Sequence, residues 1–123
     1  MVQEKIILGN LNIKRDFGYA PKYIEAMWLM LQQNFSEDFI ICSGKSILLK
    51  DIVEYIFKKL NIDKDLIYVD ENLFRPNEVY EIIGDNSKAK KILNWEYTDS
   101  FFDIIDILIY EEEKHYKKGK ICI

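Results

Sequence analysis

The chain has 123 residues, of which 49% are hydrophobic and 31% charged, and its formal net charge at pH 7 is −4. A chain of this length and composition is one globular domain or part of one, and not a disordered segment. The negative charge argues against general binding to nucleic acid or to an anionic membrane, because both require basic patches. No apolar run reaches the roughly 20 residues that span a bilayer, and the residues after Met1 are too briefly apolar for a secretory leader. We therefore expect a cytoplasmic protein with unpaired thiols at Cys42 and Cys122.

The first part of the chain predicts a strand, a loop and an amphipathic helix. Residues 6–8 are apolar and precede Gly9 and Asn10, which is typical of a short strand that ends in a turn. The charged residues 14–18 predict a loop. Pro21 stands where a helix can start, and apolar side chains then recur at helical spacing to residue 31. We expect this helix to have one buried face, formed by Tyr23, Ala26, Met27, Met30 and Leu31. We also expect the stripe of Tyr23, Met27 and Met30, with Trp28, to belong to the core.

The rest of the chain continues the alternation of strands and helices. We expect a buried strand at 39–42, a helix at 49–60, a strand at 66–69, a loop at 74–78, a helix at 85–95 and a last helix from residue 99 or 100. The residue before Pro76 is disfavoured in a helix, and Asp85 is a good helix cap. The prediction is an α/β chain of short strands alternating with helices, with residues 1–123 forming a single domain or a fragment.

Two motifs match known functional patterns, a phosphate-binding loop and a catalytic Tyr-x-x-x-Lys pair, but the residues around them argue against both functions. Gly44-Lys45-Ser46 follows the predicted strand as in a phosphate-binding loop, but the glycine required five residues earlier is replaced by Phe39. Two Tyr-x-x-x-Lys pairs, Tyr110 with Lys114 and Tyr116 with Lys120, match a pattern in which a lysine activates a tyrosine as a base. The first pair encloses three glutamates, whose charge raises the pKa of a tyrosine instead of lowering it. We therefore predict neither a phosphate loop nor a catalytic tyrosine.

Two arginines stand in unusual surroundings. Arg15 follows a turn and precedes Asp16, and Arg75 lies between an aromatic residue and a proline, with Glu78 three residues on. A guanidinium group is planar, permanently charged and suited to phosphate oxygens, and the proline reduces the entropy that its loop loses on binding. Two such groups brought together could hold a diphosphate. The alternative is a structural ion pair between Arg15 and Asp16.

Several segments, in the same order along the chain, resemble the GDP-mannose 4,6-dehydratase family of extended short-chain dehydrogenases/reductases. The resemblance covers residues 5 to about 110, and its main motifs are Leu8-Gly9-Asn10, Arg15-Asp16-Phe17-Gly18, Phe74-Arg75-Pro76-Asn77-Glu78, Gly84-Asp85 and Leu93-Asn94-Trp95. It is specific for nucleotide-sugar enzymes and less specific for the dehydratases over the related reductases and epimerases. The chain departs from the family in having Phe17 for tryptophan, Tyr19 for histidine and Pro21-Lys22 for Lys-Asp. The segment between the second predicted helix and Val69 is shorter than in many dehydratases of the family, which keeps the reductase alternative open.

The resemblance implies the C-terminal, substrate-binding part of a Rossmann-type nucleotide-sugar enzyme without its dinucleotide-binding half. In this family the arginines of the two motifs contact the substrate phosphates, which implies that role for Arg15 and Arg75. The resemblance further implies that Leu8, Gly9, Asn10 and Lys14 line the nucleotide and that Glu78 binds substrate hydroxyls. NAD or NADP belongs to the Rossmann half, so this chain is expected to bind no cofactor and no metal and to hold no catalytic residue.

The implied substrate is a nucleotide-diphosphate sugar resembling GDP-mannose. By resemblance, the complete enzyme oxidises the sugar at C4, eliminates water across C5 and C6, and returns the hydride to C6. We expect this chain to supply the nucleotide-diphosphate pocket and to be inactive alone. The alternatives are a fragment of a GDP-sugar reductase or epimerase, and a non-catalytic binding or assembly module. A face that the Rossmann half would cover is expected to be exposed and to cause homo-oligomerisation.

Overall fold

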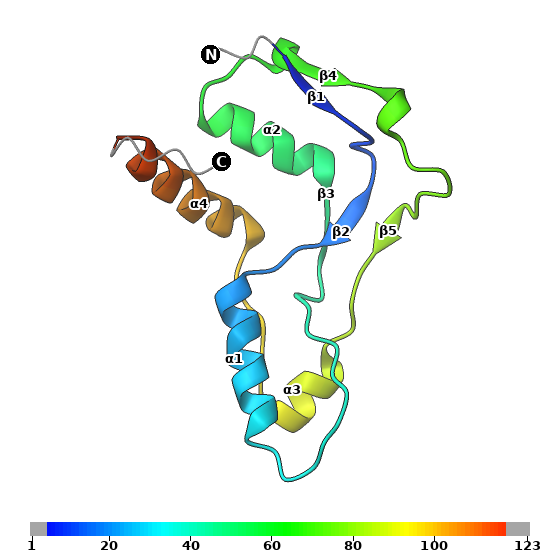
Figure 1. Cartoon of the computed structure of the whole chain (residues 1–123), viewed down its shortest axis with the longest axis vertical. Coiled ribbons are helices and arrows are strands. Elements are labelled where there is room, and N and C mark those ends of the chain that lie inside the picture. The colour runs from blue at the N-terminus through cyan, green and yellow to red at the C-terminus, as the bar shows by residue number, and fades with distance from the viewer. Residues whose placement is uncertain (1–4, 118–123) are drawn as a thin grey trace.

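The computed structural model describes residues 5–117, so Cys122, Lys120 and the segment after Met1 discussed above lie outside the described residues. The elements in chain order are β1 (Ile6–Leu8), β2 (Lys14–Asp16), α1 (Ala20–Leu31), β3 (Ser46–Leu48), α2 (Leu49–Lys59), η1 (Lys64–Leu66), β4 (Ile67–Val69), η2 (Glu71–Leu73), β5 (Glu81–Ile82), α3 (Ser87–Leu93) and α4 (Phe101–Lys117). Figure 1 shows β1, β4 and α2 at one end of the molecule and α1 with α3 at the other, with β2, β3 and β5 between them. The predicted α/β alternation is confirmed.

The strands form two small sheets. β1 pairs with β4 in parallel, with Ile6 opposite Ile67. The second sheet has the order β3-β2-β5, in which β2 is antiparallel to β3 and parallel to β5. Arg15 therefore lies on the central strand, opposite Ile47 on one side and Ile82 on the other. Figure 1 shows this sheet leading from the α2 end of the molecule towards α1 and α3.

The strand predictions were right for β1, nearly right for β4 and wrong for the second sheet. Residues 14–16, predicted as a loop, are the central strand. The strand is half-buried, and its charged side chains form hydrogen bonds with other segments of the chain. The prediction failed because these residues show no alternation of apolar and polar side chains. Residues 39–42, predicted as a buried strand, have no regular structure. Phe39 and Ile41 pack against the core, and the Asn86 side chain donates to the Cys42 carbonyl at 3.0 Å, so this segment is held without strand pairing. A short apolar run alone does not distinguish these cases.

The helix predictions are confirmed, with small shifts at the ends. Pro21 lies in the first turn of α1. In α2, Asp51 stands in the first turn and Lys58 and Lys59 in the last, which suits the helix dipole. The N-cap of α3 is Asn86, and the side chain of Asp85 accepts the Ser87 backbone N–H at 2.9 Å.

The core lies between α1, α3 and the beginning of α4. Its buried members are Ala26, Ala89, Leu93, Trp95, Tyr97 and Ile104. Trp95 is 2% exposed and donates to the Lys22 carbonyl at 3.1 Å, while the Tyr97 hydroxyl accepts the Tyr19 N–H at 2.8 Å. These bonds fasten the beginning of α1 to the segment between α3 and α4.

The predicted buried stripe of α1 is only half right. Ala26 is buried and Tyr23 and Met30 pack on the core, as predicted, but Met27, Trp28 and Leu31 are mostly exposed. The helix carries apolar side chains around most of its circumference, so spacing alone does not select the face that is covered.

Candidate functional site

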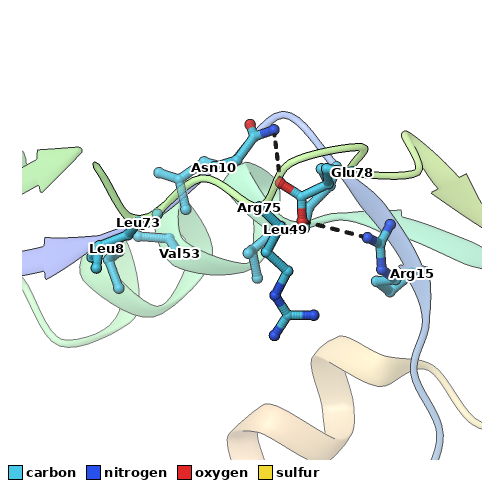
Figure 2. A pocket seen from close by; sticks show the side chains of 11 residues that line it. Leu8, Asn10, Arg15, Leu49, Val53, Leu73, Arg75 and Glu78 are labelled. Atoms are coloured by element: carbon cyan, nitrogen blue, oxygen red, sulfur yellow. Dashed lines mark hydrogen bonds and ion pairs between the residues drawn. The ribbon is translucent and has the colours of Figure 1, made fainter. Parts of the chain in front are cut away.

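A cavity of about 360 Å³ lies where the loop after η2 crosses β1 and the beginning of α2. Figure 2 shows its lining side chains. The lining residues are Leu8, Gly9, Asn10, Leu11, Ile13, Arg15, Leu49, Val53, Leu73, Arg75 and Glu78. Aliphatic side chains cover one part of the wall, and the polar groups of Asn10, Arg15, Arg75 and Glu78 gather on another.

The turn after β1 forms one edge of the cavity. A Cβ atom on Gly9 would lie 3.3 Å from the Leu73 carbonyl oxygen, so the absence of a side chain lets the two loops approach. Asn10 uses its side-chain oxygen to accept the Asn12 N–H at 2.9 Å and donates its amide to Glu78 at 3.2 Å. The turn is thereby fixed to the loop that carries Arg75.

Arg15 enters the cavity from β2 and is held by the opposite loop. Its Nη1 donates to the carbonyl of Lys14 at 2.7 Å and to that of Val79 at 2.9 Å, and its Nη2 lies 3.7 Å from a carboxylate oxygen of Glu78. The alternative of an ion pair with Asp16 is wrong, because Asp16 points to the other side and accepts bonds from Ser43 and Gly44. Successive side chains of a strand point to opposite faces, which separates the two charges.

Arg75 projects from the loop that follows η2 and is exposed. Figure 2 shows its guanidinium group directed away from Glu78. Among residues 5–117, no group forms a hydrogen bond or ion pair with this guanidinium. The cavity therefore combines one guanidinium restrained by the protein with one that is available to a ligand.

Glu78 connects the two sides of the cavity. Its side chain is 14% exposed, with one oxygen bonded to Asn10 and the other facing Arg15. Lys14, by contrast, lies outside the lining, where its ammonium is 3.8 Å from Glu81 and 6.0 Å from the centre of the Tyr80 ring. Of the predicted site residues, the structure brings together Leu8, Gly9, Asn10, Arg15, Arg75 and Glu78.

Five apolar lining residues were not predicted as part of the site. They are Leu11, Ile13, Leu49, Val53 and Leu73. Leu49 and Val53 are four apart on α2, and in the sequence they belong to an ordinary amphipathic stripe. Only the pairing of β1 with β4, which places the η2 segment over α2, shows that this stripe also forms a cavity wall.

The cavity has the electrostatic character of an anion site. The chain contains two arginines and fifteen lysines, and both arginines line this one cavity. A guanidinium group binds a phosphate or carboxylate through paired charge-assisted hydrogen bonds. The buried groups near the core whose pKa values are shifted lie outside this cavity: burial raises the pKa of Tyr23 to about 12 and also raises the pKa of Cys42 and of Tyr97. The arrangement can therefore hold an anion whose other groups contact an amide, a carboxylate and an aliphatic wall.

Other kinds of site were sought in the described part of the chain. Residues 5–117 contain no cluster of histidine, cysteine, aspartate or glutamate that could hold a metal ion. No helix in the same range is long and apolar enough to cross a membrane. The Gly44-Lys45-Ser46 motif leads into β3, of which Ser46 is the first residue, and β3 runs directly into α2, so the motif does not form the turn between strand and helix that binds phosphate.

The fold is that of nucleotide-sugar dehydratases and epimerases. dTDP-glucose 4,6-dehydratase from Bacillus anthracis in complex with NAD matches with a TM-score of 0.80 and 18% identity, over 93% of this chain and 36% of that one. UDP-glucose 4-epimerase from Thermotoga maritima with UDP-glucose matches with a TM-score of 0.70 and 23% identity, over 81% of this chain and 32% of that one.

Sequence relationships narrow the class to one family. The family model for GDP-mannose 4,6 dehydratase matches residues 1–108. The GDP-mannose 4,6 dehydratase of Dictyostelium discoideum is 36% identical over 94% of this chain and 38% of its own length. GDP-mannose 4,6 dehydratase 2 of Arabidopsis thaliana is 35% identical over 99% of this chain and 33% of its own length. The chain belongs to the GDP-mannose 4,6-dehydratase family and spans about a third of the length of these relatives.

Proposed function

We propose that this chain is the part of a GDP-mannose 4,6-dehydratase-like protein that binds a nucleotide-diphosphate sugar resembling GDP-mannose. The observation that carries the proposal is that both arginines of the chain, 60 residues apart in sequence, line the same cavity. Family membership supports the choice of ligand, because the relatives are named for GDP-mannose.

Each polar group of the cavity has a proposed role. Arg75 takes a phosphate first, since it has no partner among the described residues, and Arg15 contributes the second guanidinium. Glu78, already an acceptor for Asn10, binds hydroxyl groups of the ligand. Leu8, Gly9 and Asn10 line the nucleotide.

Lys14 is the predicted site residue that lies apart from the cavity. Its ammonium pairs with Glu81 at 3.8 Å. Lys14 therefore reaches the ligand only after that contact breaks, and we propose a minor role for it, as a positive charge at the rim.

We also propose that this chain binds its ligand without performing chemistry. The one carboxylate of the cavity, Glu78, is already engaged by Asn10 and lies beside Arg15. The described residues do not fit a dinucleotide, because none of their strands is followed by a glycine-rich turn into a helix, and β3 passes into α2 without any intervening residue. NAD or NADP would accordingly belong to the other part of the family fold, and a cytoplasmic location stays a prediction.

The proposal is tested by calorimetric titration of the chain with GDP, UDP and GDP-mannose. A charge-assisted hydrogen bond contributes about 1.5–3 kcal/mol, so Arg75→Ala should weaken GDP binding about 10- to 100-fold. Lys91→Ala removes one exposed positive charge on α3, away from the cavity, and serves as the matched control that should leave the affinity nearly unchanged. The proposal is refuted if the chain binds none of the three ligands, or if the two substitutions change the affinity for GDP by the same factor.

The titration also addresses the alternatives predicted from the sequence. A fragment of a GDP-sugar reductase or epimerase would use the same two arginines, and the family match favours the dehydratase. A non-catalytic assembly module would require neither arginine for its interactions. Retention of GDP binding only when Arg15 and Arg75 are both present therefore separates a nucleotide site from a pure assembly surface.

A further inference from the structure

The carboxylate of Asp16, on the face of β2 opposite Arg15, joins three segments of the chain. Its Oδ1 accepts the Ser43 N–H at 2.9 Å and the Ser43 hydroxyl at 2.6 Å. Its Oδ2 accepts the N–H of Gly44 at 2.9 Å and that of Gly84 at 3.3 Å. One side chain thus receives four hydrogen bonds from segments that are 27 to 68 residues away.

The groups around Asp16 are closely fitted to it. Ser43 is buried, with 6% of its surface exposed. Gly44 has a φ of +74°, a left-handed conformation that favours glycine. A Cβ atom on Gly84 would lie 2.5 Å from the Cys42 sulfur, so this segment passes close to the one that carries Ser43. Asp16 therefore lies where two backbone segments come together and direct their N–H groups at one carboxylate.

These bonds fasten the end of the three-stranded sheet. Gly84 lies two residues after the end of β5, and Gly44 lies two residues before the start of β3. Asp16 is the last residue of β2, the strand between them. By binding both neighbours at this end, the carboxylate opposes sliding or separation of β5 and β3 relative to β2.

The position of β5 in turn decides how Arg15 is held. The Lys14 N–H donates to the Tyr80 carbonyl at 2.7 Å, and the Arg15 guanidinium donates to the Val79 carbonyl at 2.9 Å. These carbonyls come directly before β5, and the loop with Arg75 and Glu78 comes directly before them. A shift of β5 along β2 would move the acceptors of Arg15 together with the second arginine.

We propose that Asp16 is a positioning residue of the anion site: through Ser43, Gly44 and Gly84 it fixes β5 against β2 and so sets the distance and orientation between Arg15 and Arg75. This inference rests on the proposed function, because it assumes that the two arginines share a ligand. The residue acts through the sheet and does not touch the ligand, since its side chain is on the other face of the strand from Arg15.

The substitution Asp16→Asn tests the proposal with little change in shape. An amide places its NH2 group either against the N–H groups of Gly44 and Gly84 or against the N–H and hydroxyl of Ser43. In both cases one acceptor oxygen is lost and the NH2 group faces at least one backbone N–H. The matched control is Asp63→Asn, because Asp63 also accepts a backbone N–H, that of Asp65 at 3.1 Å, but at η1 and outside the cavity. Circular dichroism and the amide NMR spectrum establish that each variant is folded.

The first readout requires no ligand. Arginine side-chain NMR signals can be assigned by substitution because the chain has two arginines. In the unsubstituted chain, the Arg15 guanidinium protons should exchange with solvent at least about tenfold more slowly than those of Arg75, since they are hydrogen-bonded to carbonyls. In Asp16→Asn this protection should fall towards the Arg75 value, and Asp63→Asn should retain it.

The second readout is the affinity for GDP, which Asp16→Asn should weaken about tenfold and Asp63→Asn should not change. A folded Asp16→Asn variant with unchanged affinity or unchanged Arg15 protection overturns the proposal, and the residue then has a structural role only. If that variant does not fold, Ser43→Ala decides, because it removes the hydroxyl bond to Asp16 at 2.6 Å and the hydroxyl's local bonds with Lys45 but leaves the three backbone bonds to the carboxylate in place. Partial loss of Arg15 protection in this variant supports the proposal, and no loss overturns it. A wild-type chain that binds no GDP refutes the proposed function itself, which is a different result.

Discussion

Replacement of Trp28 by glutamate should abolish self-association of this chain through the outer face of α1. Ile24, Met27, Trp28 and Leu31 follow one another at helical spacing and are 63%, 55%, 63% and 79% exposed. Residues at this spacing share one side of a helix, and a contiguous apolar patch of this kind marks a surface that is covered in the assembled protein. By resemblance the Rossmann part of the family fold would cover such a face, and in a solution of residues 1–123 alone a second copy can do so.

The expected strength of the association follows from these exposed fractions. Full burial of a large apolar side chain stabilises by about 1.5–3 kcal/mol, so covering what remains exposed gives about 1–2 kcal/mol for each of the four. Two copies together gain about 8–16 kcal/mol, against a cost of about 4–15 kcal/mol for lost translational and rotational freedom. The gain and the cost are of the same size, so the association is expected to be weak and to depend on protein concentration. Trp28→Glu removes about 2 kcal/mol from each copy and should weaken association by at least about 100-fold.

Sedimentation velocity over about 10 µM to 1 mM protein is the appropriate assay, because it detects weak self-association as a function of concentration. Tyr116→Glu is the matched control, since Tyr116 is 77% exposed on α4 and away from the patch. The wild type and this control should associate to the same extent, and Trp28→Glu should sediment as a monomer. A wild-type chain that is strictly monomeric throughout would refute the reasoning.

Three further predictions concern the core. Trp95→Ala should lower the free energy of unfolding by about 3–5 kcal/mol in urea denaturation, because it empties a buried aromatic site, and a loss below 1 kcal/mol would contradict this. Gly84→Ala should destabilise by about 1–3 kcal/mol, since the new Cβ lies 2.5 Å from the Cys42 sulfur, and Cys42→Ala in the same chain should recover part of the loss. Burial raises the pKa of Tyr23 from 10.0 to about 12, so its contribution to stability is complete below pH 10 and is lost as the pH rises through 12. Between pH 10 and about 12 the wild type should therefore lose more stability than Tyr23→Phe, and parallel pH profiles would count against the assigned burial.

The sequence predicted the helices better than the sheets, for a physical reason. The helices carry a period that can be read locally, together with Pro21 at the beginning of α1 and Asp85 beside the start of α3. The strands are two or three residues long and are defined by pairing with distant segments, as β2 is with β5. So short an element has too few side chains to show alternation, and β5 was missed for this reason. The charged residues of β2 were assigned to a loop because their partners lie elsewhere in the chain.

The candidate site shows the same division between local and distant information. Arg15 and Arg75 were singled out by residue type, by the neighbouring proline and by resemblance, and the structure places both at one cavity. The aliphatic wall and the position of Lys14 depend on how β1, β4 and α2 pack, which no single segment specifies. Their prediction would have required the strand pairing to be known first.

The contrast between Arg15 and Asp16 shows where reasoning from sequence ends. The two residues are adjacent and oppositely charged, and an ion pair between them was the simplest structural alternative. A strand sends successive side chains to opposite faces, so assigning residues 14–16 to a strand would by itself have excluded that pair. The same assignment gives each charge its own surroundings: the guanidinium faces Val79 and Glu78, and the carboxylate faces backbone N–H groups. The state of three residues thus decides whether this motif is a neutralised surface pair or the central support of a binding site.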